Sequence, residues 1–180
     1  MEFAKDPLTN AVYQGIKRGI QVTYDSDCFG SCLILIYSGI DAMSYLSMPV
    51  SQNEAHRKDF IKWSNKYLSP VLTNETTAIT GEELYSARCG VVHTYTVESK
   101  KTKQGSARMI GYLVGGGQPI VYDPKVAKDL VLLRLDVLRD AFFVGIDKFL
   151  VEAYAEKPKQ AELDRRVKKL LSAIPYSKKK

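Results

Sequence analysis

The chain has 180 residues, 45% of them hydrophobic, and a formal net charge of +6. This length and composition predict one globular domain with a real core. The longest uncharged apolar run, residues 28–40, stops at Asp41 and falls well short of the ~20 residues of a membrane-spanning helix, so it predicts a buried helix and no membrane association.

The cysteines exclude a disulfide framework. They are odd in number, and Cys28 and Cys32 are neighbours on a helix while Cys89 lies far away. This pattern favours reduced thiols and a cytoplasmic protein, and the N-terminal residues 1–7 do not resemble a secretion signal. Cys28 and Cys32 lack a second pair of ligands at zinc-finger spacing. We therefore expect neither a metal nor a cofactor.

The first half of the chain predicts helices over residues 9–20, 28–46 and 54–68. Asp27 is the expected cap of the second helix, which should end before the Met48-Pro49 pair because the residue before a proline avoids helical backbone angles. The third helix carries aromatic residues three and four positions apart on one face, namely Phe60, Trp63 and Tyr67.

A capping box predicts the start of a fourth helix. Thr80 can accept a hydrogen bond from the amide of Glu83, whose carboxylate can reach back to the Thr80 amide. Arg88 lies in the interior of this helix.

The second half predicts a β-hairpin at about residues 108–122, then helices over about 125–155 and 159–173. Asp123-Pro124 is the expected start of the longer helix. The fold class is thus mainly α, a helical bundle with an inserted hairpin, organised as one domain over 1–175 with a basic tail at 176–180. A basic cluster of the kind that attracts phosphate backbones lies at the C-terminus, but we interpret its lysines as a solubilising tail. The cluster comprises Arg165, Arg166, Lys168, Lys169 and Lys178–Lys180.

The most informative motif is Arg88-x4-His93, in an apolar segment that should be buried. Histidine moves protons near neutral pH, and the planar guanidinium of arginine matches phosphate. Two plainer readings remain open: a hydrogen-bonded structural His93, and an ion pair of Arg88 with Asp41 or Glu83. Asp41 interrupts an apolar helix and needs a partner, so it is the best candidate to position Arg88.

These residues resemble the HEPN superfamily (higher eukaryotes and prokaryotes nucleotide-binding domains). The similarity lies in Leu-Ile-Leu-Ile-Tyr-Ser-Gly-Ile-Asp41 on an early helix and in Glu83-Leu-Tyr-Ser-Ala-Arg-Cys-Gly-Val-Val-His93. It implies a helical homodimer that cleaves RNA without a metal. His93 would be the general base on a ribose 2′-hydroxyl, and Arg88 would stabilise the charge on phosphorus, giving 2′,3′-cyclic phosphate products.

The resemblance also implies roles for two further residues. In one toxin branch of the superfamily a nucleotidyltransferase-like antitoxin adenylylates the tyrosine found at Tyr95, which makes Tyr95 a candidate regulatory site; a packing role is equally open. Active members usually carry a polar residue at the position of Cys89. A non-catalytic dimer that binds RNA, a nucleotide or a partner protein is therefore the alternative, followed by a purely structural domain.

Basic residues follow the motif and predict RNA contacts, since such segments attract phosphate backbones: Lys100, Lys101, Lys103 and Arg108. His56 lies in a polar run and is the expected surface histidine. Five residues turn a straight α-helix through about 140°. Either the helix ends near Val92 and His93 turns back towards Arg88, or the two side chains meet across a two-fold axis.

Overall fold

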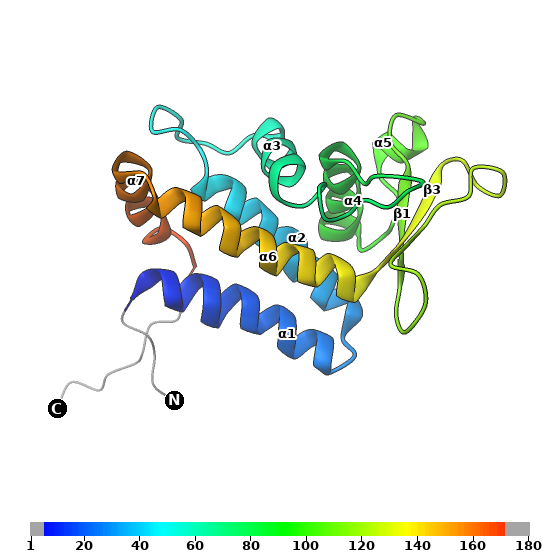
Figure 1. Ribbon diagram of the computed structural model, residues 1–180, viewed down its shortest axis with the longest axis horizontal. Helices are drawn as coiled ribbons and strands as arrows, with labels where there is room; N and C mark the ends of the chain where they lie inside the picture. The colour runs from blue at the N-terminus through cyan, green and yellow to red at the C-terminus, as the bar shows by residue number, and fades with distance from the viewer. Residues whose placement is uncertain (1–5, 172–180) are drawn as a thin grey trace.

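The computed structural model describes residues 6–171 as a mainly helical fold with one small sheet (Figure 1). The helices are η1 (Thr9–Lys17), α1 (Arg18–Asp25), α2 (Phe29–Leu46), α3 (Arg57–Tyr67), α4 (Gly81–Thr94), α5 (Lys100–Lys103), α6 (Leu135–Tyr154) and α7 (Lys157–Val167). The strands are β1 (Met109–Leu113), β2 (Ile120–Val121) and β3 (Leu130–Arg134). The tail predicted at 176–180, with Lys178–Lys180, lies outside the described residues.

Helix α2 is the centre of the fold. It packs against α1, α3, α4 and α6, and its residues Ile36, Tyr37, Ile40 and Met43 are fully buried. Among the described helices it alone is long and apolar enough to cross a membrane, with a mean hydropathy of 1.4, and 44% of it is buried inside the fold. The prediction of a helix over 28–46 is confirmed to within one residue.

The turn before α2 differs from the prediction. The first helix continues through η1 and α1 to Asp25, beyond the expected end at Ile20. Asp27 does not cap α2: it adopts a left-handed backbone with φ 56°, and Cys28 occupies the cap position without a side-chain bond. A sharp reversal between two long helices requires one such residue, and aspartate tolerates this conformation better than most.

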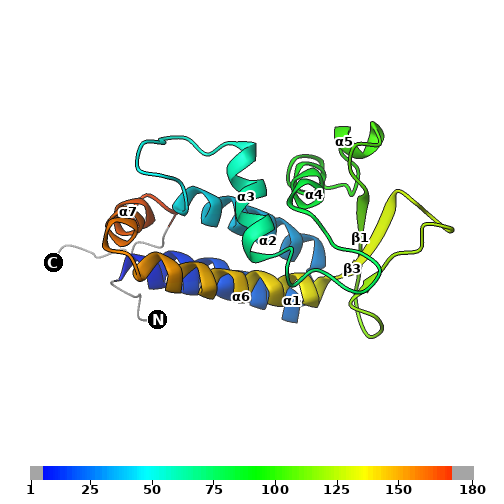
Figure 2. The same ribbon diagram turned by 45° about the horizontal axis from the view of Figure 1, so that its top comes forward.

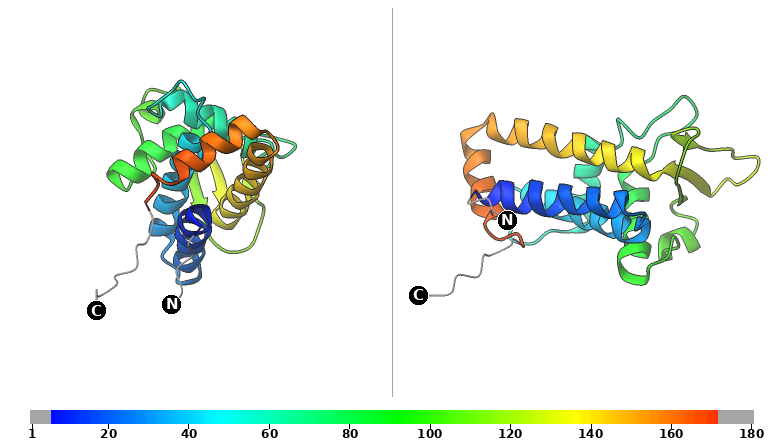
Figure 3. Two further views of the ribbon diagram at one scale, coloured as in Figure 1. Left: turned by 90° about the vertical axis from the view of Figure 1, so that its left-hand side faces the viewer. Right: turned by 90° about the horizontal axis from the view of Figure 1, so that it is seen from below.

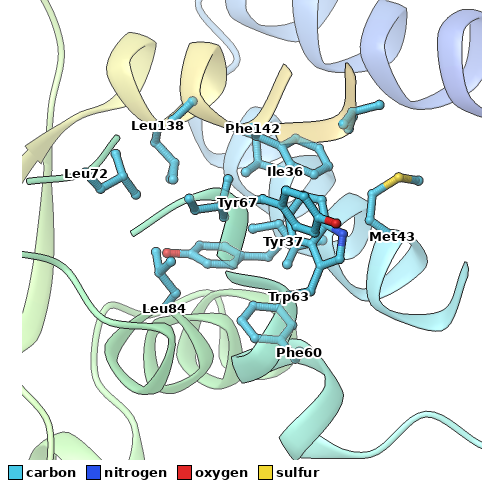
Figure 4. Packing of buried hydrophobic residues seen from close by; sticks show 14 of the residues in the cluster. Ile36, Tyr37, Met43, Phe60, Trp63, Tyr67, Leu72, Leu84, Leu138 and Phe142 are labelled. Carbon is cyan, nitrogen blue, oxygen red and sulfur yellow. The ribbon is translucent and has the colours of Figure 1, made fainter. Parts of the chain in front are cut away.

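An aromatic cluster joins α3 to α6. The ring of Trp63 lies against those of Tyr67, Phe142 and Phe149, mostly edge to face at centroid distances between 5.1 and 6.4 Å. Figure 4 shows Trp63, Tyr67 and Phe142 in the core beside side chains of α2. Phe60, Trp63 and Tyr67 are all buried, which confirms that they share the inward face of the third helix.

The predicted β-hairpin is wrong. Strand β3 lies between the other two, parallel to β1 and antiparallel to β2, so β1 and β2 do not pair. Residues 130–134 were expected to be helical, but Val131 and Leu133 are buried while their neighbours are partly exposed, which is the alternation of a strand. Helix α6 therefore begins at Leu135, ten residues after the predicted start at Lys125.

Helix α7 closes the end of the molecule opposite the sheet. The sheet lies at one end and α7 crosses the other (Figure 3). On α7, Arg166 is only 1% exposed and bonds Glu162 and the backbone oxygens of Tyr45, Pro49 and Gln52. Arg166 is thus withdrawn from the basic cluster at the C-terminus, because its bonds hold α7 against the α2–α3 loop.

Candidate functional site

Helices α2 and α4 run antiparallel and carry the site between them. Arg88 of α4 contacts Asp41 of α2, while Tyr95 at the end of α4 lies against Gly30 at the start of α2. Eleven residues of α2, about 16 Å of helix, separate the two contacts. In Figure 2, α4 lies next to β1, and the short helix α5 follows it.

The expected contact between Arg88 and Asp41 is confirmed. Arg88 donates from Nε to Oδ2 of Asp41 at 2.8 Å, and its Nη2 lies 2.8 Å from the same oxygen in the ion pair. Their side chains are 20% and 36% exposed. Burial raises the pKa of Asp41, and the bonds and charge of Arg88 offset this only in part. Burial alone would lower the pKa of Arg88, but Asp41 more than offsets it. The carboxylate thus fixes the guanidinium at the edge of the fold.

Arg88 also reaches His93 within the same chain. Its Nη1 lies 2.7 Å from Nε2 of His93. Neither predicted geometry is needed for this contact: α4 stays helical through Thr94, and the long arginine side chain bridges the turn. Because a guanidinium can only donate, Nε2 is the acceptor and a neutral His93 carries its proton on Nδ1. His93 is exposed, contrary to the expected burial.

The other two residues near the motif are placed differently. Cys89 is partly buried next to Arg88 in sequence. Tyr95 ends α4 in a left-handed conformation with φ 55° and is 68% exposed. Its hydroxyl lies over Gly30, where a Cβ would be only 1.8 Å away. Tyr95 is therefore outside the Arg88–Asp41 contact and open to solvent.

A close approach at Gly90 positions the segment after the motif. A Cβ at Gly90 would lie 2.6 Å from the carbonyl oxygen of Thr96 and 2.5 Å from that of Glu98, so only glycine admits this loop. The hydroxyls of Ser86 and Ser99 meet in the interior at 2.5 Å. Together these contacts hold the start of α5 against α4.

The predicted RNA-contacting cations fall into two groups. Lys100 and Lys103 are exposed on α5, and Lys101 bonds Glu82 of α4 at 3.0 Å. Arg108 instead binds Glu83 through Nε (2.5 Å) and Nη2 (3.1 Å), and also bonds Thr77 and the Ala78 carbonyl. Its guanidinium thus joins the start of β1 to the capping box, which leaves Lys100 and Lys103 as the exposed cations of the four.

The sequence reading missed a small pocket beside Arg88. The pocket has a volume of about 110 Å³, and α3 contributes His56, Arg57 and Phe60 to its lining. Tyr85 of α4 also lines the pocket. Its position three residues before Arg88, on the same helix face, was the one feature of the sequence that could have indicated the pocket. His56 is exposed as expected, but only the packing of α3 on α4 brings it to this site.

A larger cavity lies away from these residues. It measures about 460 Å³ and lies among the end of α2, α3, α6 and α7. Its lining is mainly apolar, with the Lys66–Glu152 ion pair at its edge. Neither Arg88 nor His93 lines it, so its larger size does not make it the better candidate for the chemistry.

Comparison with protein-family models, curated proteins and solved structures found no match for this chain. Within residues 6–171, no group of three or more His, Cys, Asp or Glu side chains is placed to hold a metal ion. The function is therefore argued from the geometry of Asp41, Arg88 and His93.

Proposed function

We propose that this protein is a metal-independent endoribonuclease of the HEPN type. The observation that supports this most is the 2.7 Å contact of Arg88 with His93 on an accessible face, with Asp41 holding the arginine from behind. Cleavage of a phosphodiester by a neighbouring hydroxyl requires a base for the hydroxyl proton and a cation for the charge on phosphorus. His93 and Arg88 place both groups together at the surface.

The resting contact defines the first step of the proposed reaction. Arg88 occupies the lone pair of His93 Nε2, so a substrate phosphate must first draw the Nη1 donor towards itself. The freed Nε2 then takes the proton of the ribose 2′-hydroxyl. The 2′-oxygen forms a bond to phosphorus, the bond to the 5′-oxygen breaks, and that oxygen takes a proton from water. The hydroxide left behind takes the proton from His93, which returns the imidazole to its neutral form. Arg88 stabilises the charge on the phosphoryl oxygens throughout, while Asp41 keeps the guanidinium in place.

The proposal includes RNA and a second copy of the chain as partners. Lys100, Lys101 and Lys103 would contact the RNA backbone next to the site, and Lys100 makes no ion pair with a described residue. In a homodimer the α4 face that carries Arg88 and His93 would line a shared cleft. Because both groups already meet within one chain, we expect dimerisation to shape the RNA channel rather than to assemble the pair.

The toxin or defence role, the cytoplasmic location and a nucleotidyltransferase-like antitoxin are part of the same proposal. The exposure of Tyr95 supports it as the modified residue, since its side chain is open to solvent. Adenylylation would add a charged, bulky group at the end of α4. The cleft would then repel RNA.

The test is end-group analysis of RNA incubated with the protein in a metal chelator. We expect 2′,3′-cyclic phosphate and 5′-hydroxyl ends from the wild type, and a loss of at least 100-fold in cleavage rate for Arg88→Ala and His93→Ala. Arg165→Ala is the matched control, because it also removes an ion-paired arginine but at the far end of the fold.

Two outcomes contradict the nuclease proposal. Cleavage that survives both substitutions would come from another protein in the sample. Salt-dependent RNA binding without any cut product would favour the non-catalytic alternative, to which the apolar Cys89 already points.

A further inference from the structure

The pocket beside Arg88 has walls of a distinct kind. Phe60 and Tyr85 lie edge to face with their ring centroids 5.4 Å apart, and the guanidinium of Arg57 lies 5.5 Å above the Tyr85 ring. His56 is exposed at the N-terminal end of α3 and also lines the pocket. Aromatic rings and arginine planes are the surfaces on which unpaired bases stack.

Beside its arginines, the pocket has two lining residues whose oxygens can accept hydrogen bonds. Both Arg88 bonds go to Oδ2 of Asp41, and Oδ1 has no hydrogen-bond partner among the described residues. Ser44 is 1% exposed and donates its hydroxyl proton to the Ile40 carbonyl at 2.7 Å, so only its lone pairs remain. Asp41 and Ser44 are both lining residues of the pocket.

The volume limits what can enter. About 110 Å³ is well below the 300–1,000 Å³ of typical drug-sized ligand sites, so a whole nucleotide does not fit. The edge of one planar ring does fit, with the sugar and phosphate left outside, next to Arg88.

We propose that this pocket is a subsite for one unpaired RNA base that carries an exocyclic amino group. The inference rests on the proposed action on RNA and adds a base preference to it. The amino group of adenine, cytosine or guanine supplies two N–H donors, which Asp41 Oδ1 and Ser44 Oγ can accept. Uracil has no amino group, and its single N–H lies between two carbonyl acceptors that would face these oxygens. Uridine is therefore disfavoured at this position.

The test separates base recognition from cleavage. Binding is measured with the His93→Ala protein, which keeps the pocket but lacks the proposed base, and with single-stranded oligouridine that contains one A, C, G or U next to a fixed site. We expect binding to the amino-bearing oligonucleotides to be about 5- to 10-fold tighter than to all-uridine. Cleavage of the same series by the wild-type protein is measured in parallel.

Two pocket substitutions and one control complete the design. Ser44→Ala removes one acceptor at nearly constant volume and should reduce the preference over uridine to about twofold or less. His56→Ala should weaken binding of every base by about 5- to 10-fold, as expected for a lost stacking surface. Asn53→Ala is the control, since Asn53 is exposed and uncharged in the loop before α3 and does not line the pocket.

The outcomes distinguish this inference from the proposed function. Cleavage with no base preference, unchanged by Ser44→Ala and His56→Ala, overturns the subsite and leaves the nuclease standing. A base preference in binding without any cleavage supports the subsite and overturns the nuclease. If the protein binds none of the oligonucleotides, both are overturned.

Discussion

Arg88 donates from Nη1 to Nε2 of His93 at 2.7 Å, five residues further along the same helix. The same guanidinium holds Asp41 of α2 with its other two nitrogens. One side chain thus links the two helices and covers the lone pair that a general base requires. In the proposed reaction, a substrate phosphate would draw Arg88 away and free this lone pair.

This contact predicts the tautomer of His93. In the wild type, the neutral ring should carry its proton on Nδ1, because Nε2 accepts from Arg88. In Arg88→Ala the ring is free to take either tautomer. The ¹⁵N chemical shifts of the neutral His93 ring should report the change, and those of His56 serve as the internal control. Equal His93 spectra in both proteins would rule out the contact.

Two neighbouring arginines on α7 should differ sharply in their effect on stability. Arg166→Ala removes a buried donor that the Glu162 carboxylate shares with three backbone oxygens, and it should lower the free energy of unfolding by about 3 kcal/mol or more. Arg165→Ala removes a half-exposed, solvent-screened partner of the same carboxylate and should lower stability far less than Arg166→Ala does. Urea denaturation of both variants checks this, and equal losses would contradict the assigned role of Arg166.

The same carboxylate predicts a pH dependence. The hydrogen bonds from Arg165 and Arg166 lower the pKa of Glu162 from 4.5 to about 2. A depressed pKa stabilises the fold above the unfolded value and is lost as the pH falls. Stability should therefore drop between about pH 4.5 and pH 2. The difference between wild type and Glu162→Gln in urea denaturation should be largest near neutral pH and shrink across that window; a constant difference would refute the assignment.

Gly90 should not tolerate a side chain. A methyl group there meets two backbone oxygens at 2.5 and 2.6 Å, so the loop that leads to α5 must move. We expect Gly90→Ala to destabilise the protein by about 1–3 kcal/mol, more than the helical preference of alanine returns. Gly116→Ala is the control, because nothing lies within 4 Å of its added Cβ and its effect should stay within about 0.5 kcal/mol. The free energies of unfolding of the two variants, measured by thermal or urea denaturation, check this prediction. Equal values would contradict it.

Local patterns were enough for much of the fold. The apolar run of α2, the aromatic spacing on α3 and the Thr80–Glu83 capping box all rest on contacts within a few residues, and each prediction is confirmed. The Arg88–Asp41 ion pair was also foreseeable, because a carboxylate inside an apolar helix requires a partner. The order of residue types along the chain was therefore sufficient for these predictions.

Only the tertiary structure decided the rest. The pairing of β1 with β3 joins residues about twenty positions apart, and no period in the sequence distinguishes the Leu-Val run of β3 from the start of α6. Helix packing buries Arg166 and brings His56 close to Arg88. In the sequence alone, both residues look like ordinary surface residues. Contacts between distant segments form because packing buries apolar area and gives buried polar groups their hydrogen-bond partners. Neither effect can be read from a short stretch of sequence.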